Sequence, residues 1–214
     1  MGLVADVFSE EILKKLAGRH AIGHVRYSTA GESMIRNAQP ICATTDAGPV
    51  AIAHNGNLIN AHAIRQELEG RGAIFGSTSD SEVILHLLAR SREATFEDRF
   101  IDALSRVKGA FSAVMLTEDA LIAARDPNGF RPLSLGRLDG SYVVASETCA
   151  LDLIGADFER DIEPGEVVVI RRGRIRSVRP LSREKSEHFC VFEYIYFARP
   201  DSNLLRSNVY AFRK

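Results

Sequence analysis

The stretch PVAIAHNGNL, residues 49–58, joins a short apolar segment to a cluster of polar residues. Residues 49–53 are short, apolar and partly β-branched, which predicts a β-strand. His54-Asn55-Gly56-Asn57 follows at once, and an Asn-Gly pair after a strand is most simply a hairpin turn. Polar residues gathered at the end of a strand are also a common place for a binding or catalytic site. Other features of the sequence are needed to distinguish a hairpin turn from a functional site here.

Short apolar segments of the same kind recur after this stretch. We expect further strands at residues 111–117, 120–125, 142–146, 166–171 and 174–178. Arg172-Gly173 separates the last two and predicts a hairpin turn, because glycine tolerates positive φ. So many consecutive strands favour antiparallel pairing.

Three helices are expected between the first strand and the others. Asn60 is a candidate N-cap for a helix that ends near Gly70. Ser79-Asp80-Ser81-Glu82 has the form of a capping box and opens an apolar stripe. Thr95 begins a similar helix that reaches about Val107. One strand, three helices and then many strands are typical of the α+β class and not of a doubly wound fold.

Composition excludes several classes of protein. The 214 residues are 45% hydrophobic, with a formal net charge of −1, so neither a nucleic-acid partner nor a membrane surface is indicated. No apolar run approaches the roughly 18 residues that would span a bilayer, and no secretory signal is visible. Cys42, Cys149 and Cys190 are scattered and form no C-x-x-C pair, which favours a reducing compartment. We therefore expect a cytoplasmic globular protein.

Three more loops are rich in polar residues and glycine: residues 23–31 (GHVRYSTAG), 77–82 (STSDSE) and 125–132 (RDPNGFRP). Each has a purely structural explanation. Asp80 suits a helix N-terminus, Arg26 could lie on an exposed strand, and residues 126–129 form a good turn. Singly, none of these loops indicates a function.

Together and in order, the four loops resemble the class II glutamine amidotransferases. The His-Asn-Gly-Asn segment at 54–57 occurs across that class. The run FEYIYFARPDS at 192–202 is similar to the glutaminase domain of the amidophosphoribosyltransferases, and argues against a class II enzyme with another acceptor domain. The resemblance covers nearly the whole chain, including residues 142–149 and 163–166.

The resemblance implies roles for five residues. Asn55 and Gly56 fall where the family has its oxyanion hole, which uses one side-chain amide and one backbone N–H. Arg26 matches the residue that binds the α-carboxylate of glutamine, for which a planar guanidinium is well suited. Asp80 matches the acid that receives the α-ammonium group, and Thr29 belongs to the loop that closes over glutamine.

The resemblance also implies the fold. It is an αββα four-layer sandwich of the N-terminal-nucleophile hydrolase type, expected here to be incomplete at its N-terminus. Residues 1–190 would form the glutaminase domain without its first strands. Residues 191–214 would lead to a phosphoribosyltransferase domain, which is the expected missing partner, and the complete family members are expected to be homo-oligomers.

Cofactors are expected only in the complete family, as magnesium and, in some members, an iron–sulfur cluster. Cys190 matches a cluster ligand of those members. A single cysteine cannot hold a cluster, and no His, Cys and carboxylate group has zinc spacing. We therefore expect no cofactor in this chain, and interpret Cys190 as a buried inert thiol ahead of a ligand.

The nucleophile of the family is an N-terminal cysteine whose own α-amino group acts as base. None of the three cysteines matches it, and by comparison with the family the chain begins inside the domain. We expect part of an amidophosphoribosyltransferase, which uses glutamine-derived ammonia to convert phosphoribosyl pyrophosphate to 5-phosphoribosylamine in purine biosynthesis. The chain alone is expected to be inactive. The alternative is a non-catalytic relative that binds glutamine or a protein partner.

Overall fold

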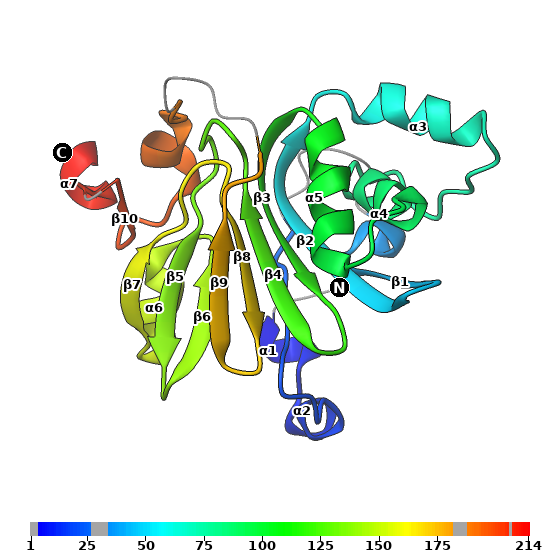
Figure 1. Cartoon of the computed structure of the whole chain (residues 1–214). Helices are drawn as coiled ribbons and strands as arrows, with labels where there is room; N and C mark the ends of the chain where they lie inside the picture. Colours follow the sequence, from blue (N-terminus) through cyan, green and yellow to red (C-terminus); the bar gives the residue numbers. More distant parts are fainter. Residues whose placement is uncertain (1–3, 27–33, 182–187, 206) are drawn as a thin grey trace.

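The computed structural model describes residues 4–26, 34–181, 188–205 and 207–214 (Figure 1). It begins with two short helices, α1 (Val4–Val7) and α2 (Glu10–Lys15), followed by the 3-10 helix η1 (Ile35–Asn37). The Ser9 side chain accepts a hydrogen bond from the Ile12 N–H and caps α2. No residue of α2 is buried, so these first helices add little to the core.

The larger sheet has six strands, and every neighbouring pair is antiparallel. In spatial order they are β1 (Ile41–Thr45), β2 (Gly48–Leu58), β3 (Gly109–Leu116), β4 (Ala120–Arg125), β8 (Val167–Arg171) and β9 (Arg174–Val178). The strands predicted at 120–125 and 174–178 are confirmed to the residue. The strand predicted at 49–53 is too short, because β2 continues through the His-Asn-Gly-Asn segment.

The smaller sheet has the order β6 (Ser141–Ala145), β5 (Ser134–Leu138) and β7 (Asp157–Asp161). The sequence did not predict β5 or β7, because glycine and charged residues interrupt their apolar pattern. Gly136 lies where the register between β5 and β7 shifts, and a Cβ there would be 2.7 Å from the Asp157 carbonyl oxygen. A close backbone approach therefore accounts for a glycine within this strand.

Helices α4 (Ser81–Arg90) and α5 (Phe96–Arg106) cover one face of the larger sheet, and α3 (Ala61–Glu69) packs beside α4 (Figure 1). Alternate residues of a strand point to opposite faces. On β4, Ile122 belongs to the core beneath these helices, whereas Ala123 belongs to a second core between the two sheets. Helix α6 (Thr148–Ile154) packs on the smaller sheet, with Leu151 against Gly136. The layers follow the expected αββα order.

Two of the predicted helix starts differ from the sequence interpretation. The capping box at 79–82 is wrong, because the Glu82 carboxylate accepts from the backbone N–H groups of Gly76 and Ser77 and from the Ser77 hydroxyl. Asn60 precedes α3 but makes no cap bond; its amide instead bonds the Arg106 carbonyl and the Lys108 N–H. The cap at Thr95 is confirmed by a hydrogen bond from the Asp98 N–H.

The C-terminal segment forms a small unit of its own. It comprises the π-helix η2 (Glu193–Phe197), the short strands β10 (Asn203–Leu204) and β11 (Ser207–Asn208), and helix α7 (Val209–Arg213). Tyr194, Ala198, Leu204 and Val209 make a separate apolar cluster. Within the described residues, no helix combines the length and apolar character needed to cross a bilayer.

Candidate active site

The polar loops meet at a cavity of about 660 Å³. Its lining comprises His24, Val25, Arg26, Gln39, His54, Asn55, Gly56, Asn57, Ser79, Asp80, Ala110, Phe130, Arg131, Cys190, Tyr196 and Phe197. Four of the five residues assigned from the sequence are among them: Arg26, Asn55, Gly56 and Asp80. The fifth, Thr29, lies outside the described residues.

Asn55 and Gly56 lie within strand β2, so the hairpin-turn interpretation is wrong. They pair with Ser112 and Phe111 of β3. Gly56 has a φ of +150°, and a Cβ there would be 2.0 Å from the Ala110 carbonyl oxygen. Only glycine fits, because any side chain would collide with the neighbouring strand. The bare backbone of Gly56 therefore reaches the cavity at a place where its φ would direct any side chain into strand β3.

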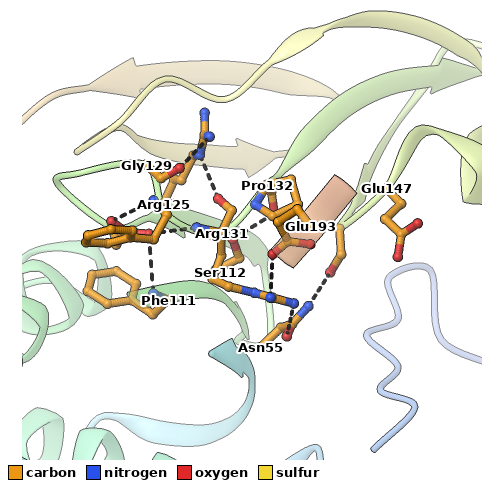
Figure 2. A network of polar contacts seen from close by, with 12 residues as sticks. Asn55, Phe111, Ser112, Arg125, Gly129, Arg131, Pro132, Glu147 and Glu193 are labelled. Atoms are coloured by element: carbon orange, nitrogen blue, oxygen red, sulfur yellow. Dashed lines mark hydrogen bonds and ion pairs between the residues drawn. The ribbon is translucent and has the colours of Figure 1, made fainter. Parts of the chain in front are cut away.

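The side chain of Asn55 is held on both of its polar atoms (Figure 2). Its Oδ1 accepts a hydrogen bond from Arg131 Nη2 at 2.8 Å, and its Nδ2 donates to Ser146 Oγ at 3.3 Å. An amide nitrogen carries two hydrogens, so the bond to Ser146 uses one of them. This orientation keeps Nδ2 a donor, which is what an oxyanion site requires.

Asp80 joins the start of α4 to the end of β2. Its Oδ2 accepts a hydrogen bond from the Leu58 N–H at 2.9 Å. The His54 Nδ1 lies 3.9 Å from Asp80 Oδ1 and 3.1 Å from Ser81 Oγ. Burial lowers the pKa of His54, so its ring is neutral and serves as a hydrogen-bonding support. His54 is thus a structural support for Asp80 and the start of α4.

Arg26 and His24 border the cavity from the segment that precedes the undescribed residues 27–33. Both are half-buried. Burial is the main cause that lowers the pKa of His24, and the nearby His54 and Arg26 lower it further. A neutral His24 next to Arg26 leaves the guanidinium as the positive group on this side of the cavity.

Asp126 organises the loop that carries Arg131. Its carboxylate is fully buried and accepts hydrogen bonds from the N–H groups of Asn128, Phe130, Arg131 and Phe111, at 3.0 to 3.4 Å. Burial raises the pKa of Asp126, while the four N–H groups oppose that rise. One buried carboxylate therefore satisfies four backbone donors at once.

Arg125 completes the same loop from the other side. It is buried, and its guanidinium donates to the carbonyl groups of Arg131, Ile162 and Gly129 at 2.8 to 2.9 Å. The turn predicted at 126–129 is confirmed by a bond from the Gly129 N–H to the Asp126 carbonyl. Because both ends of the loop are bonded, Arg131 projects from a well-defined backbone (Figure 2).

Arg131 also contacts the C-terminal segment. Its Nη1 donates to Glu193 Oε1, and its guanidinium lies 5.2 Å from the centre of the Phe197 ring. Burial raises the pKa of Glu193 to about 7, against the opposing effect of Arg131 and with a smaller contribution from Glu147. Glu193 is thus an acid that changes charge near neutrality, on a segment in direct contact with the site.

A raised pKa makes stability depend on pH. Between the ordinary pKa of 4.5 and about 7, the unfolded state ionises Glu193 while the folded state keeps it protonated. The contribution of Glu193 to the free energy of unfolding is therefore complete below pH 4.5. It is lost as the pH rises to about 7, and the total loss is about 3 kcal/mol. Urea denaturation at several pH values should show this slope in the wild type, relative to Glu193→Gln. Parallel curves for the two proteins would contradict it.

Cys190 lines the cavity and is half-buried, so the expectation of a buried thiol is wrong in that respect. An iron–sulfur cluster needs about four ligands, mostly thiolates. Of the other cysteines, Cys42 is exposed and Cys149 is buried. Among the described residues, no group of three or more His, Cys, Asp or Glu could hold a metal ion. These residues by themselves do not fit a cluster.

Comparison with known proteins agrees with this geometry. A glutamine amidotransferase domain family matches residues 24–153, which is more than half of the chain. The chain belongs to this glutamine amidotransferase family. The matched span contains the four residues that the sequence assigned and the structure brings to one cavity.

Individual relatives of this chain have narrower names than the domain family. The amidophosphoribosyltransferase of Rhizobium etli is 50% identical over 219 residues, covering 100% of this chain and 44% of that protein. The chloroplastic amidophosphoribosyltransferase of Glycine max is also 50% identical, covering 100% of the chain and 38% of that protein. The chain therefore spans less than half the length of these relatives.

A solved structure of glutamine phosphoribosylpyrophosphate amidotransferase from B. subtilis, complexed with ADP and GMP, has a TM-score of 0.83. It is 46% identical, and the match covers 89% of this chain and 41% of that one. The shared fold is that of the N-terminal-nucleophile hydrolases, as expected from the sequence.

Several residues that support the cavity had no role assigned from the sequence. Arg131 and Glu193 stand in the quoted motifs at 125–132 and 192–202, yet nothing local shows that they pair. Gln39 makes two hydrogen bonds to the backbone of His54, at 2.7 and 3.2 Å, and had no sequence signal. These contacts join segments 15 to 76 residues apart, so only the folded structure shows them.

Proposed function

We propose that the cavity binds glutamine and that this chain supplies the binding and charge-stabilising groups of a glutaminase site. The observation that carries the proposal is the meeting of Arg26, Asn55, Gly56 and Asp80 around one cavity. A guanidinium suits the α-carboxylate of an amino acid and a carboxylate suits its α-ammonium group. The amide of Asn55 and the backbone N–H of Gly56 suit the side-chain carbonyl oxygen.

The reaction step that these groups serve is attack on the side-chain amide of glutamine. In the family an N-terminal cysteine attacks the amide carbon, and the carbonyl oxygen becomes negatively charged. Asn55 and Gly56 would stabilise that charge, and one such donor is typically worth about 3–4 kcal/mol in the transition state. Ammonia then leaves, and water hydrolyses the thioester to glutamate. We propose that the 214-residue chain alone binds glutamine without releasing ammonia.

We further propose that this site works within an amidophosphoribosyltransferase, as in the relatives that are 50% identical. Residues 1–190 would form the glutaminase part and residues 191–214 would lead toward the phosphoribosyltransferase part. The separate apolar cluster of the C-terminal segment supports that division. The ammonia would convert phosphoribosyl pyrophosphate to 5-phosphoribosylamine, with magnesium as a cofactor of the complete enzyme, as a cytoplasmic homo-oligomer.

Calorimetric titration with glutamine tests the binding proposal. We expect Asp80→Asn to weaken glutamine binding at least about tenfold, because the change removes one charge-assisted contact with the α-ammonium group. The substituted amide keeps an oxygen that can accept the Leu58 N–H, so the fold should persist. Asp102→Asn on the exposed face of α5 is a matched control and should bind as the wild type does. Equal affinity in Asp80→Asn would contradict the proposed role of Asp80.

A further inference from the structure

A continuous set of contacts links the C-terminal segment to Asn55 through one side chain (Figure 2). Arg131 donates to Glu193 with Nη1 and to Asn55 with Nη2. We infer that Arg131 is a positioning residue that fixes which way the Asn55 amide points, and that Glu193 of η2 controls this through Arg131. The consequence for catalysis rests on the proposed function, because there Asn55 is the oxyanion donor.

The orientation argument depends on what each partner can do. A guanidinium only donates, so Arg131 must face the oxygen of the Asn55 amide and not its nitrogen. Ser146 is the other partner, and a hydroxyl both donates and accepts. Ser146 would therefore tolerate either orientation of the amide. Of these two contacts, only the one from Arg131 selects the orientation with Nδ2 as a donor.

Both the backbone and the side chain of Arg131 are bonded, so a movement of Glu193 can reach Asn55 through this one residue. Its backbone N–H bonds the Asp126 carboxylate, and its carbonyl accepts from Arg125 Nε. Its side chain is 17% exposed and that of Glu193 only 2%. A displacement of η2 would therefore act on Asn55 through a short and largely dehydrated link, where a charged contact is strong.

Protonation is a second way to change the same link. The groups that act on Glu193 are Arg131, Arg125 and Glu147, and His54 lies within electrostatic range of Arg131. Glu147 in turn accepts hydrogen bonds from the Arg199 N–H and the Ser202 hydroxyl. The C-terminal segment therefore carries Glu193 and also binds Glu147. Loss of the charge on Glu193 weakens its hold on Arg131 and should loosen the orientation of the Asn55 amide.

Nuclear magnetic resonance of the 214-residue chain without glutamine tests this inference. The side-chain amide signals of Asn55, assigned by their loss in Asn55→Asp, should shift with pH in the wild type with a midpoint near 7. Glu193→Gln should abolish that shift. Arg131→Gln should both abolish it and move the Asn55 signals away from their wild-type positions.

Matched controls come from a second Arg–Glu pair remote from the cavity lining. Arg137 Nε lies 3.7 Å from Glu159 Oε2, and the Arg137 guanidinium lies 4.1 Å from the centre of the Tyr142 ring. Like Arg131, it therefore contacts one carboxylate and one aromatic ring. Arg137→Gln and Glu159→Gln should leave the Asn55 signals and their pH dependence unchanged. Asn55 signals that are the same in Arg131→Gln as in the wild type would overturn the inference.

A second variant of Arg131 covers the case in which the first one does not fold. If Arg131→Gln does not fold, Arg131→Lys keeps the positive charge but cannot bond two partners with a fork, so the pH-dependent shift should still be lost. A pH-dependent shift retained in both Arg131→Lys and Glu193→Gln would overturn the inference. Because the spectra need no ligand, they are independent of glutamine binding, whose failure would appear only in the calorimetric titration.

Discussion

Gly56→Ala is expected to destabilise the protein by about 4 kcal/mol or more, enough to leave much of it unfolded. The added methyl group would lie 2.0 Å from the Ala110 carbonyl oxygen and 2.8 Å from its carbon. Both are backbone atoms of the neighbouring strand, which cannot move aside as a flexible side chain could. The φ of +150° adds strain for any residue with a Cβ. Loss of the circular dichroism signal or a large fall in the urea midpoint would show this effect.

Gly173→Ala separates the two causes. Gly173 also has a positive φ, of +72°, in the hairpin between β8 and β9, but a Cβ there would meet no atom within 4 Å. We expect it to cost only about 1 kcal/mol, from backbone strain alone. If both variants lost the same small amount, the contact with Ala110 would not be what requires glycine at position 56.

The same glycine shows where local sequence rules stop. An Asn-Gly pair has a strong turn preference, and the strand before it was predicted correctly as far as residue 53. The real reason for Gly56 is contact with Ala110, a residue more than 50 positions away in the chain. Local patterns carry no information about such a contact. The family resemblance did, because it treated residues 54–57 as one functional unit.

Local patterns worked best where an apolar run or a glycine turn marks the element. Strand β4 is buried at all six positions and was predicted to the residue, and α5 has the predicted Thr95 cap. Strand β7, with the sequence DFERD, is exposed or half-buried throughout and has no pattern to detect. In the site, the residues proposed to bind glutamine were identified by resemblance. Their supports, such as Gln39, Arg131 and Glu193, depend on tertiary contacts.

Asp126→Ala is expected to be the most damaging change in the loop that supports the site. It would leave four backbone N–H groups without the acceptor that they share, in a position with no solvent exposure. A bond to a charged group is worth about 1.5–3 kcal/mol, and the four are not additive because they share one carboxylate. We expect a loss of about 4 kcal/mol, measured by urea denaturation at neutral pH.

Asp126→Asn and Asp102→Ala make this prediction specific. The asparagine keeps one oxygen but places an NH₂ group against backbone donors, so it should also destabilise strongly, by about 2 kcal/mol or more. Asp102 is exposed on α5, and its replacement should change stability by no more than about 0.5 kcal/mol. Near wild-type stability in Asp126→Ala would mean that the loop can satisfy its donors in another way. In that case the Asp126 carboxylate would not be what fixes the backbone of Arg131. The contact with Glu193 alone would then have to hold the Arg131 side chain against Asn55.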